Sequence, residues 1–97
     1  MVFVIGTFRV EPSERAAFIS NRVPLMQHSR AEAGCVIYTF TEDPIEHDVV
    51  VLTEQWIDRP SLDAHLAGLA TAPQPATMPG STGRDIAVFE ADDGAKL

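Results

Sequence analysis

The chain has 97 residues, of which 45% are hydrophobic, and its fourteen acidic and seven basic residues give a formal net charge of −7. This length fits one domain, which we expect over residues 1–97 with a core over about 2–90. The excess of acidic over basic residues, without a cluster of basic residues in the sequence, argues against nucleic acid as a partner. No apolar run could span a bilayer and the amino terminus lacks a signal-peptide pattern, so we expect a cytoplasmic protein without a membrane partner.

The first third of the chain has the pattern of a strand followed by a helix. Residues 2–10 alternate with apolar side chains on both faces, as in a strand. Ser13 is a candidate N-cap for a helix that runs to about Arg30. Pro24 lies inside this span and removes one backbone donor, so we expect a kink or a break there.

The middle and end of the chain alternate between strands and one further helix. Residues 36–41 and 48–56 are typical of strands, and the polar turn between them predicts an antiparallel pair. Asp58 as N-cap, with Pro60 in the first turn, predicts a helix over residues 59–70. Residues 71–84 carry three prolines and two glycines and predict an irregular loop. A last strand fits residues 85–90, and residues 91–97 form a polar tail.

The predicted order is β-α-β-β-α-β, which indicates an α+β, ferredoxin-like fold with a four-stranded antiparallel sheet and two helices on one face. Two helices cover only that face, yet the first and third strands carry apolar side chains on both faces. An uncovered apolar face of several hundred Å² favours association with a second copy, so we expect a homodimer that packs sheet to sheet.

Trp56 and His65 are the candidate functional residues. In a strand, Glu54 and Trp56 share one face, and in the following helix Leu62, His65, Leu66 and Leu69 form an apolar stripe. The short turn between the two elements brings the indole and the imidazole close together. A hydrogen-bonded core histidine and a core tryptophan are the structural alternatives. Glu54 is a candidate to orient His65, or else to pair with an arginine.

The single Cys35 excludes an internal disulfide and a cysteine-based zinc site, and we predict no metal site. Its place beside a glycine is typical of a small buried hydrophobic residue.

Several short motifs together resemble the antibiotic biosynthesis monooxygenase family. They are Ala33-Gly34-Cys35 before the second strand, Tyr38 within it, Glu54-x-Trp56 at the end of the third strand, and Leu62-Asp63-Ala64-His65-Leu66 in the second helix. The resemblance covers residues 2 to about 69. It implies a dimeric α+β barrel that oxygenates an electron-rich phenol, quinol or anthrone-like substrate with O₂, without metal, flavin or haem as a cofactor. It also implies His65 as the base, Trp56 in the pocket, and substrate contacts from Tyr38, Glu54, Leu62 and Leu69.

Other functions stay open on the sequence. A non-catalytic dimeric module that binds an aromatic small molecule would use the same fold with His65 as a structural residue. An isomerase would use His65 as a base without oxygen. A haem-degrading relative of the fold would have an asparagine on the first strand, where this chain has Gly6 and Thr7.

Overall fold

A four-stranded antiparallel sheet organises the molecule. The structure, a computed structural model, describes residues 1–74 and 80–97. The strands are β1 (Val2–Arg9), β2 (Cys35–Glu42), β3 (Val49–Trp56) and β4 (Gly83–Glu90), and they lie in the order β2-β3-β1-β4. A short 3-10 turn, η1 (Pro12–Glu14), and the helices α1 (Arg15–Ser20), α2 (Val23–Arg30) and α3 (Arg59–Gly68) complete the fold. This confirms the predicted ferredoxin-like arrangement.

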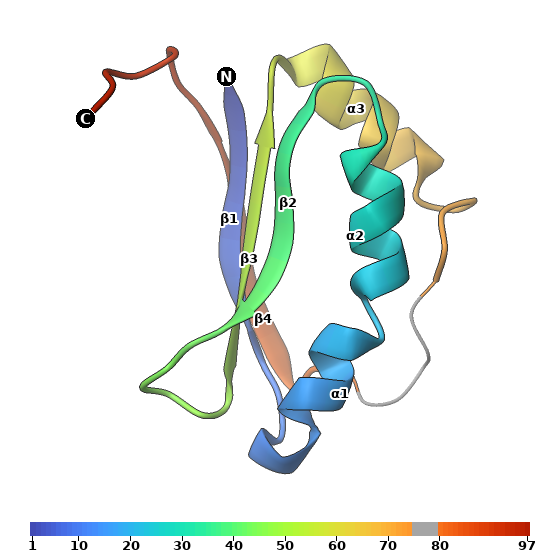
Figure 1. Cartoon of the computed structure of the whole chain (residues 1–97), viewed down its shortest axis with the longest axis vertical. Helices are drawn as coiled ribbons and strands as arrows, with labels where there is room; N and C mark the ends of the chain where they lie inside the picture. Colours follow the sequence, from blue (N-terminus) through green and yellow to red (C-terminus); the bar gives the residue numbers. More distant parts are fainter. Residues whose placement is uncertain (75–79) are drawn as a thin grey trace.

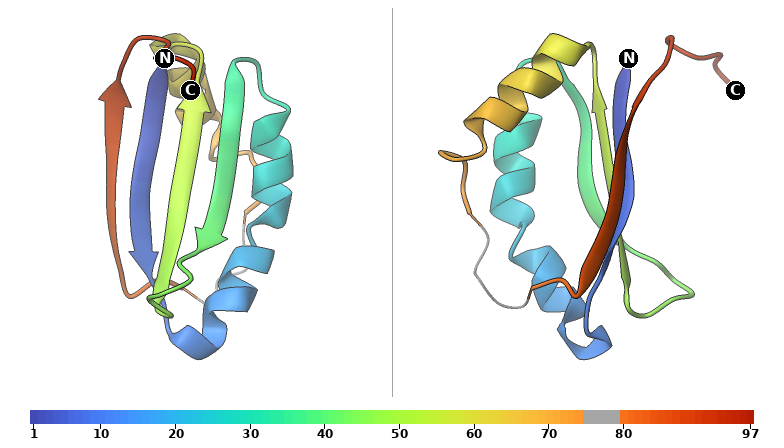
Figure 2. Two further views of the ribbon diagram at one scale, coloured as in Figure 1. Left: turned by 60° about the vertical axis from the view of Figure 1, so that its left-hand side comes forward. Right: turned by 180° about the vertical axis from the view of Figure 1, so that it is seen from behind.

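The helices form one layer on one side of the sheet. Figure 1 shows α1, α2 and α3 on the same side, and the left view of Figure 2 shows the opposite face of the strands without a covering helix. The chain's sheet is open at β2 and β4 and is not a closed barrel. A barrel made by two chains therefore stays a prediction. Among the described residues, no helix has the length and apolarity to cross a membrane.

The period of two predicted for the strands is confirmed by burial. Val2 and Val4 of β1 and Leu52, Glu54 and Trp56 of β3 are buried, whereas the residues between them are only partly buried or exposed. Register partners such as Val4 and Glu54 share one face of the sheet, so the buried residues of the two strands lie together on the face that the helices cover. The functional candidates of β3 thus lie under the helix layer.

The helix predicted over 13–30 is interrupted, as expected, but its start and the position of the break differ from the prediction. Ser13 lies in η1, and the cap of that turn, Glu11, makes no side-chain capping bond. The helix stops at Ser20 and restarts at Val23, so the break precedes Pro24, which stands in the first turn of α2. The backbone N–H groups in the first turn of a helix have no carbonyl partner within the helix. A proline, which lacks the N–H, therefore fits at this position without a kink.

The second half of the chain follows the prediction with small shifts. Asp58 caps α3, because its carboxylate accepts a hydrogen bond of 2.9 Å from the Ser61 N–H. The helix ends at Gly68, two residues before the predicted end. The predicted 71–84 loop is too long, because β4 pairs with β1 from Gly83 onward, and its residues 75–79 lie outside the described residues. The predicted polar tail contains neither helix nor strand.

Gly6 sets the distance between β1 and β4. A Cβ atom at this position would meet the carbonyl oxygen of Asp85 and the Cα of Ile86 on β4. These are backbone atoms of a paired strand, which cannot move aside without disturbing the ladder. Gly6 also belongs to the helix-facing side of β1, because it lies between Val4 and Phe8 in the alternation.

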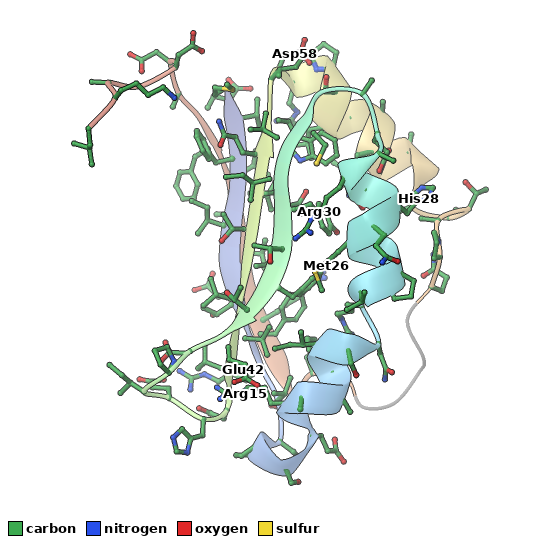
Figure 3. All side chains as sticks on the ribbon, viewed as in Figure 1. Arg15, Met26, His28, Arg30, Glu42 and Asp58 are labelled. Carbon is green, nitrogen blue, oxygen red and sulfur yellow. The ribbon has the colours of Figure 1, made fainter. Side chains whose placement is uncertain are left out.

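Arg15 ties α1 to the hairpin between β2 and β3. Its guanidinium donates to the carbonyl oxygens of Asp43 at 2.8 Å, Glu46 at 2.9 Å and Val49 at 3.1 Å. Figure 3 shows Arg15 beside Glu42, whose carboxylate lies 3.4 Å from the guanidinium. The side chain is only 12% exposed, so these bonds form largely out of water.

Replacing Arg15 with methionine should destabilise the fold. Arg15→Met keeps the aliphatic volume but leaves three hairpin carbonyls without this donor, which should lower the free energy of unfolding by about 2 kcal/mol. Chemical denaturation measures this change. Arg9→Met is the matched control, because Arg9 pairs with Glu46 and Asp48 of the same hairpin at the exposed surface and should matter little. Equal effects of the two changes would contradict the role given to Arg15.

Candidate active site

His65 and Trp56 lie together under the helix layer. The capped start of α3 fixes the phase of the helix, so that His65 faces the sheet and is only 2% exposed. Trp56, the last residue of β3, is completely buried. The two ring centroids are 4.8 Å apart, with an angle of 34° between the planes. The predicted proximity of the indole and the imidazole is therefore confirmed.

Glu32 orients the imidazole. Its Oε1 lies 2.7 Å from Nδ1 of His65, the distance of a short charge-assisted hydrogen bond. A carboxylate in this position accepts the Nδ1 proton, and the neutral ring then carries its lone pair on Nε2. Glu32 stands in the connection between α2 and β2, 33 residues before His65. No pattern in the sequence links Glu32 to His65.

Glu54 bonds to Trp56 rather than to His65. The indole Nε1–H donates to Glu54 Oε1 at 3.0 Å, whereas Nε2 of His65 lies 3.9 Å from the same oxygen, too far for a hydrogen bond. Glu54 thus makes no hydrogen bond to His65 here, and the 3.9 Å separation would be an ion pair only with a protonated imidazole. Burial raises the pKa of the Glu54 carboxyl, and the bond from Trp56 and the nearby imidazole only partly oppose that increase.

Tyr38 completes a cluster of rings around the histidine. Its ring centroid lies 5.3 Å from that of His65 and 6.5 Å from that of Trp56, both in edge-to-face geometry. Burial raises the pKa of the Tyr38 phenol, so the hydroxyl stays protonated at neutral pH and can donate a hydrogen bond. The cluster combines a fixed base with an aromatic surface.

A cavity of about 680 Å³ separates the helix layer from the sheet next to this cluster. Its size lies in the range usual for small-molecule sites. The predicted site residues that line it come from β2, β3 and α3: Tyr38, Glu54, Leu62, His65 and Leu69. Trp56 is not among the lining residues. The indole lies behind Glu54 and His65, so in this arrangement it supports the wall and does not touch the cavity.

Arg22 is a lining residue that the sequence analysis did not select. It is the residue before α2, and its guanidinium carbon lies 3.3 Å from the centroid of the Phe18 ring. Nothing in the sequence separates it from the other scattered arginines, because the expected kink or break was placed at Pro24 and not at the turn before Val23 that holds Arg22. Within residues 1–74 and 80–97, no group of three or more histidine, cysteine and acidic side chains could hold a metal ion.

The sequence of this chain is similar to two curated proteins. An uncharacterised Synechocystis protein, sll1783, is 34% identical over 66% of this chain, and that match spans 44% of the Synechocystis protein. A Bacillus subtilis protein named "Putative monooxygenase YcnE" is 34% identical over 67% of this chain and 68% of its own length.

Solved structures share the fold over nearly the whole chain. A crystal structure from Deinococcus radiodurans, described as a "putative antibiotic biosynthesis monooxygenase", superposes with a TM-score of 0.83 at 26% identity and covers 100% of this chain and 98% of its own. The Mycobacterium tuberculosis haem degrader MhuD, 15% identical with a TM-score of 0.75 over 99% of this chain and 100% of its own, shows the fold alone. The family model described as "Antibiotic biosynthesis monooxygenase" matches residues 1–70. From this match and the shared fold, the chain belongs to the antibiotic biosynthesis monooxygenase family.

Proposed function

We propose that this protein is a cofactor-independent monooxygenase that uses His65 as a base toward a quinol, phenol or anthrone-like substrate. The observation that carries this proposal is the bond between Glu32 and Nδ1 of His65, in the wall of a cavity large enough for fused rings. A base needs a lone pair held toward its substrate, and this bond leaves the lone pair on Nε2.

The first step is the transfer of a substrate proton to Nε2 of His65. The resulting imidazolium lies between two carboxyl groups, Glu32 at 2.7 Å from Nδ1 and Glu54 at 3.9 Å from Nε2. A carboxylate bonded to Nδ1 stabilises the cation that forms, as in other acid–base pairs of histidine with an acid. The leucines that line the cavity give the anionic substrate a partly apolar environment.

The second step uses oxygen as the co-substrate. The deprotonated ring passes one electron to O₂, and the substrate radical and superoxide then combine to form the carbon–oxygen bond. For an anthrone-like methylene the peroxide loses water, so that CH₂ and O₂ give C=O and H₂O. The substrate supplies all four electrons, and the protein supplies the base, the orientation and a partly apolar site.

Haem degradation is less well supported as a function. The haem-degrading arrangement implied by the fold needs an asparagine on the first strand. The helix-facing residue there is Gly6, which has no side chain to offer, and its neighbour Thr7 points to the other face of the sheet.

The open face of the sheet supports a homodimer, which we propose as the assembly. Two successive rows across the four strands carry no charge: the first contains Phe89, Phe3, Gln55 and Ile37, and the second contains Ala87, Ile5, Thr53 and Thr39. In an antiparallel sheet with one face in water, the side chains on that face are usually polar or charged. Ile5 and Phe89 are 45% and 53% exposed in the single chain. A cytoplasmic location, with neither nucleic acid nor membrane as partner, remains our expectation from composition.

Removing the base should abolish turnover. His65→Ala should lower the rate of oxygen consumption about 100-fold or more, the usual contribution of a positioned base. Glu32→Gln keeps the shape but loses the charge that stabilises the imidazolium, and should cost about tenfold. Oxygen uptake with anthrone and with 1,4-dihydroxynaphthalene, corrected for the protein-free rate, measures both effects.

The same assays separate the competing functions. His28→Ala is the control, because His28 is exposed on α2, on the side away from the sheet (Figure 3). Uptake that is unchanged in a folded His65→Ala protein would refute His65 as the base, and a natural protein that binds the probes without uptake above the protein-free rate or conversion of the probes would be a binding module. Conversion of the probes without oxygen uptake would indicate an isomerase.

Glu54 should make stability depend on pH. The folded-state pKa of this carboxyl is raised above its unfolded value, so the folded protein binds more protons between the two values and loses stability as pH rises through that window. Glu54→Gln still accepts from the Trp56 indole but does not ionise. The melting temperature of this variant, relative to the natural protein, should therefore increase as the pH rises above the ordinary glutamate pKa of about 4.3. A difference that is constant with pH would contradict the assignment, and exposed Glu90→Gln serves as the control.

A charge on the open face should separate the proposed dimer. Ile5→Lys places an ammonium in the middle of the uncharged rows, and we expect the variant to elute as a monomer in size-exclusion chromatography with light scattering. Ile45→Lys, in the exposed hairpin between β2 and β3, should leave the mass unchanged. A natural protein that is monomeric at micromolar concentration would refute the dimer.

A further inference from the structure

Ionisable side chains line the cavity: Glu54 and His65 lie close together, and Arg22, Arg84 and Asp85 also contribute to the lining. The ring of His65, which bonds to the Glu32 carboxylate, lies beside Tyr38. The guanidinium carbon of Arg22 lies 5.9 Å from the centroid of the Phe40 ring. Tyr38 and Phe40 are alternate residues of β2 on one face, with ring centroids 6.0 Å apart. His65 therefore lies beside Tyr38 and Arg22 lies nearer Phe40, two alternate residues on the same face of β2.

The Arg22 guanidinium is held rigidly in place. It stacks on the Phe18 ring at 3.3 Å, and its Nη1 donates to the Phe18 carbonyl at 2.8 Å. Phe18 itself is completely buried. A guanidinium has five N–H donors, so this single bond leaves most of them for another acceptor. A positioned, planar donor set of this kind matches a carboxylate in a bidentate contact.

No carboxylate of the protein neutralises Arg22. Among the residues that the structure describes, the recorded ion pairs involve the other arginines Arg9, Arg15 and Arg59. The sequence of residues 75–79 contains no acid. Burial lowers the pKa of Arg22, the expected effect on a half-buried cation without a counter-charge. Asp85 also lines the cavity, but it is exposed and makes no ion pair with Arg22 in the part of the chain that the structure describes.

We infer that Arg22 binds an anionic group of the substrate, a carboxylate attached to the aromatic ring system opposite the position that loses its proton to His65. This inference rests on the proposed function and narrows the substrate to an aromatic acid. Arg84 also lines the cavity, but it lies exposed on the edge strand β4, where water competes for its hydrogen bonds. Arg22 is thereby a specificity-determining residue, and His65 remains the base.

Calorimetric titration with two matched ligands that resist oxidation tests this role. In 6-hydroxy-2-naphthoic acid, the hydroxyl and the carboxylate lie at opposite ends of two fused rings, and 6-hydroxy-2-naphthamide is its neutral counterpart. The natural protein should bind the acid about tenfold or more tightly than the amide. Arg22→Gln should remove this preference, and Arg22→Lys should keep part of it because the charge remains. Melting temperatures confirm that each variant is folded.

Several outcomes would overturn the inference. Equal affinity of the natural protein for the two ligands would do so, as would a preference that survives Arg22→Gln. A preference that disappears in Arg84→Gln instead would assign the anion to β4. Exposed Arg59→Gln controls for the change in net charge. Oxygen uptake is a separate readout: an Arg22-dependent preference without turnover of any probe supports the anion site and refutes the oxygenase, and the reverse result refutes the anion site alone.

Discussion

The hydrogen bond between Glu32 and His65 is the interaction on which the site depends. It joins α3 to the connection between α2 and β2, close to the backbone hydrogen bond that Ile57, just before α3, donates to the Gly34 carbonyl. It also sets the protonation pattern of the imidazole, because Nδ1 is committed to the carboxylate and Nε2 keeps the lone pair. One contact thus positions the helix that closes the cavity and defines the chemical state of its base.

The two faces of the sheet impose a second constraint. The helix-facing residues of β1, β2 and β3 bury the core and form the floor of the cavity, so the alternation that builds the fold also supplies the site. Gly6 contributes to this floor by having no side chain, since β4 approaches its Cα closely. The other face keeps apolar side chains without a helix to cover them. A small domain that exposes such a face gains stability from a second copy.

The local patterns in the sequence predicted the elements well, and the longer-range contacts poorly. The strands and α3 follow from alternation and from the cap at Asp58, and the closeness of Trp56 and His65 follows from the short turn between β3 and α3. The break before Pro24 was misplaced, because a proline is equally compatible with a helix interior that kinks and with a new first turn. Glu32 and Arg22 could not be identified as site residues from the sequence. Neither residue lies in a strand or within a helix, so strand pairing and helix periodicity do not place them near the site. Only the tertiary fold brings them there.

The polar groups under α3 are costly for a chain with so small a core. Glu54 is 5% exposed and carries a raised pKa, and the indole N–H of a completely buried Trp56 needs that carboxyl as its acceptor. Apolar residues of similar volume could fill the same space without a desolvation penalty. Both ring nitrogens of a buried structural histidine usually have a hydrogen-bond partner. The carboxyl oxygen nearest to Nε2 of His65 lies at 3.9 Å, which is too far for a hydrogen bond. These buried polar groups, which lower the stability of the fold, lie beside His65 at the edge of the cavity. Proteins commonly tolerate such a loss of stability at catalytic sites.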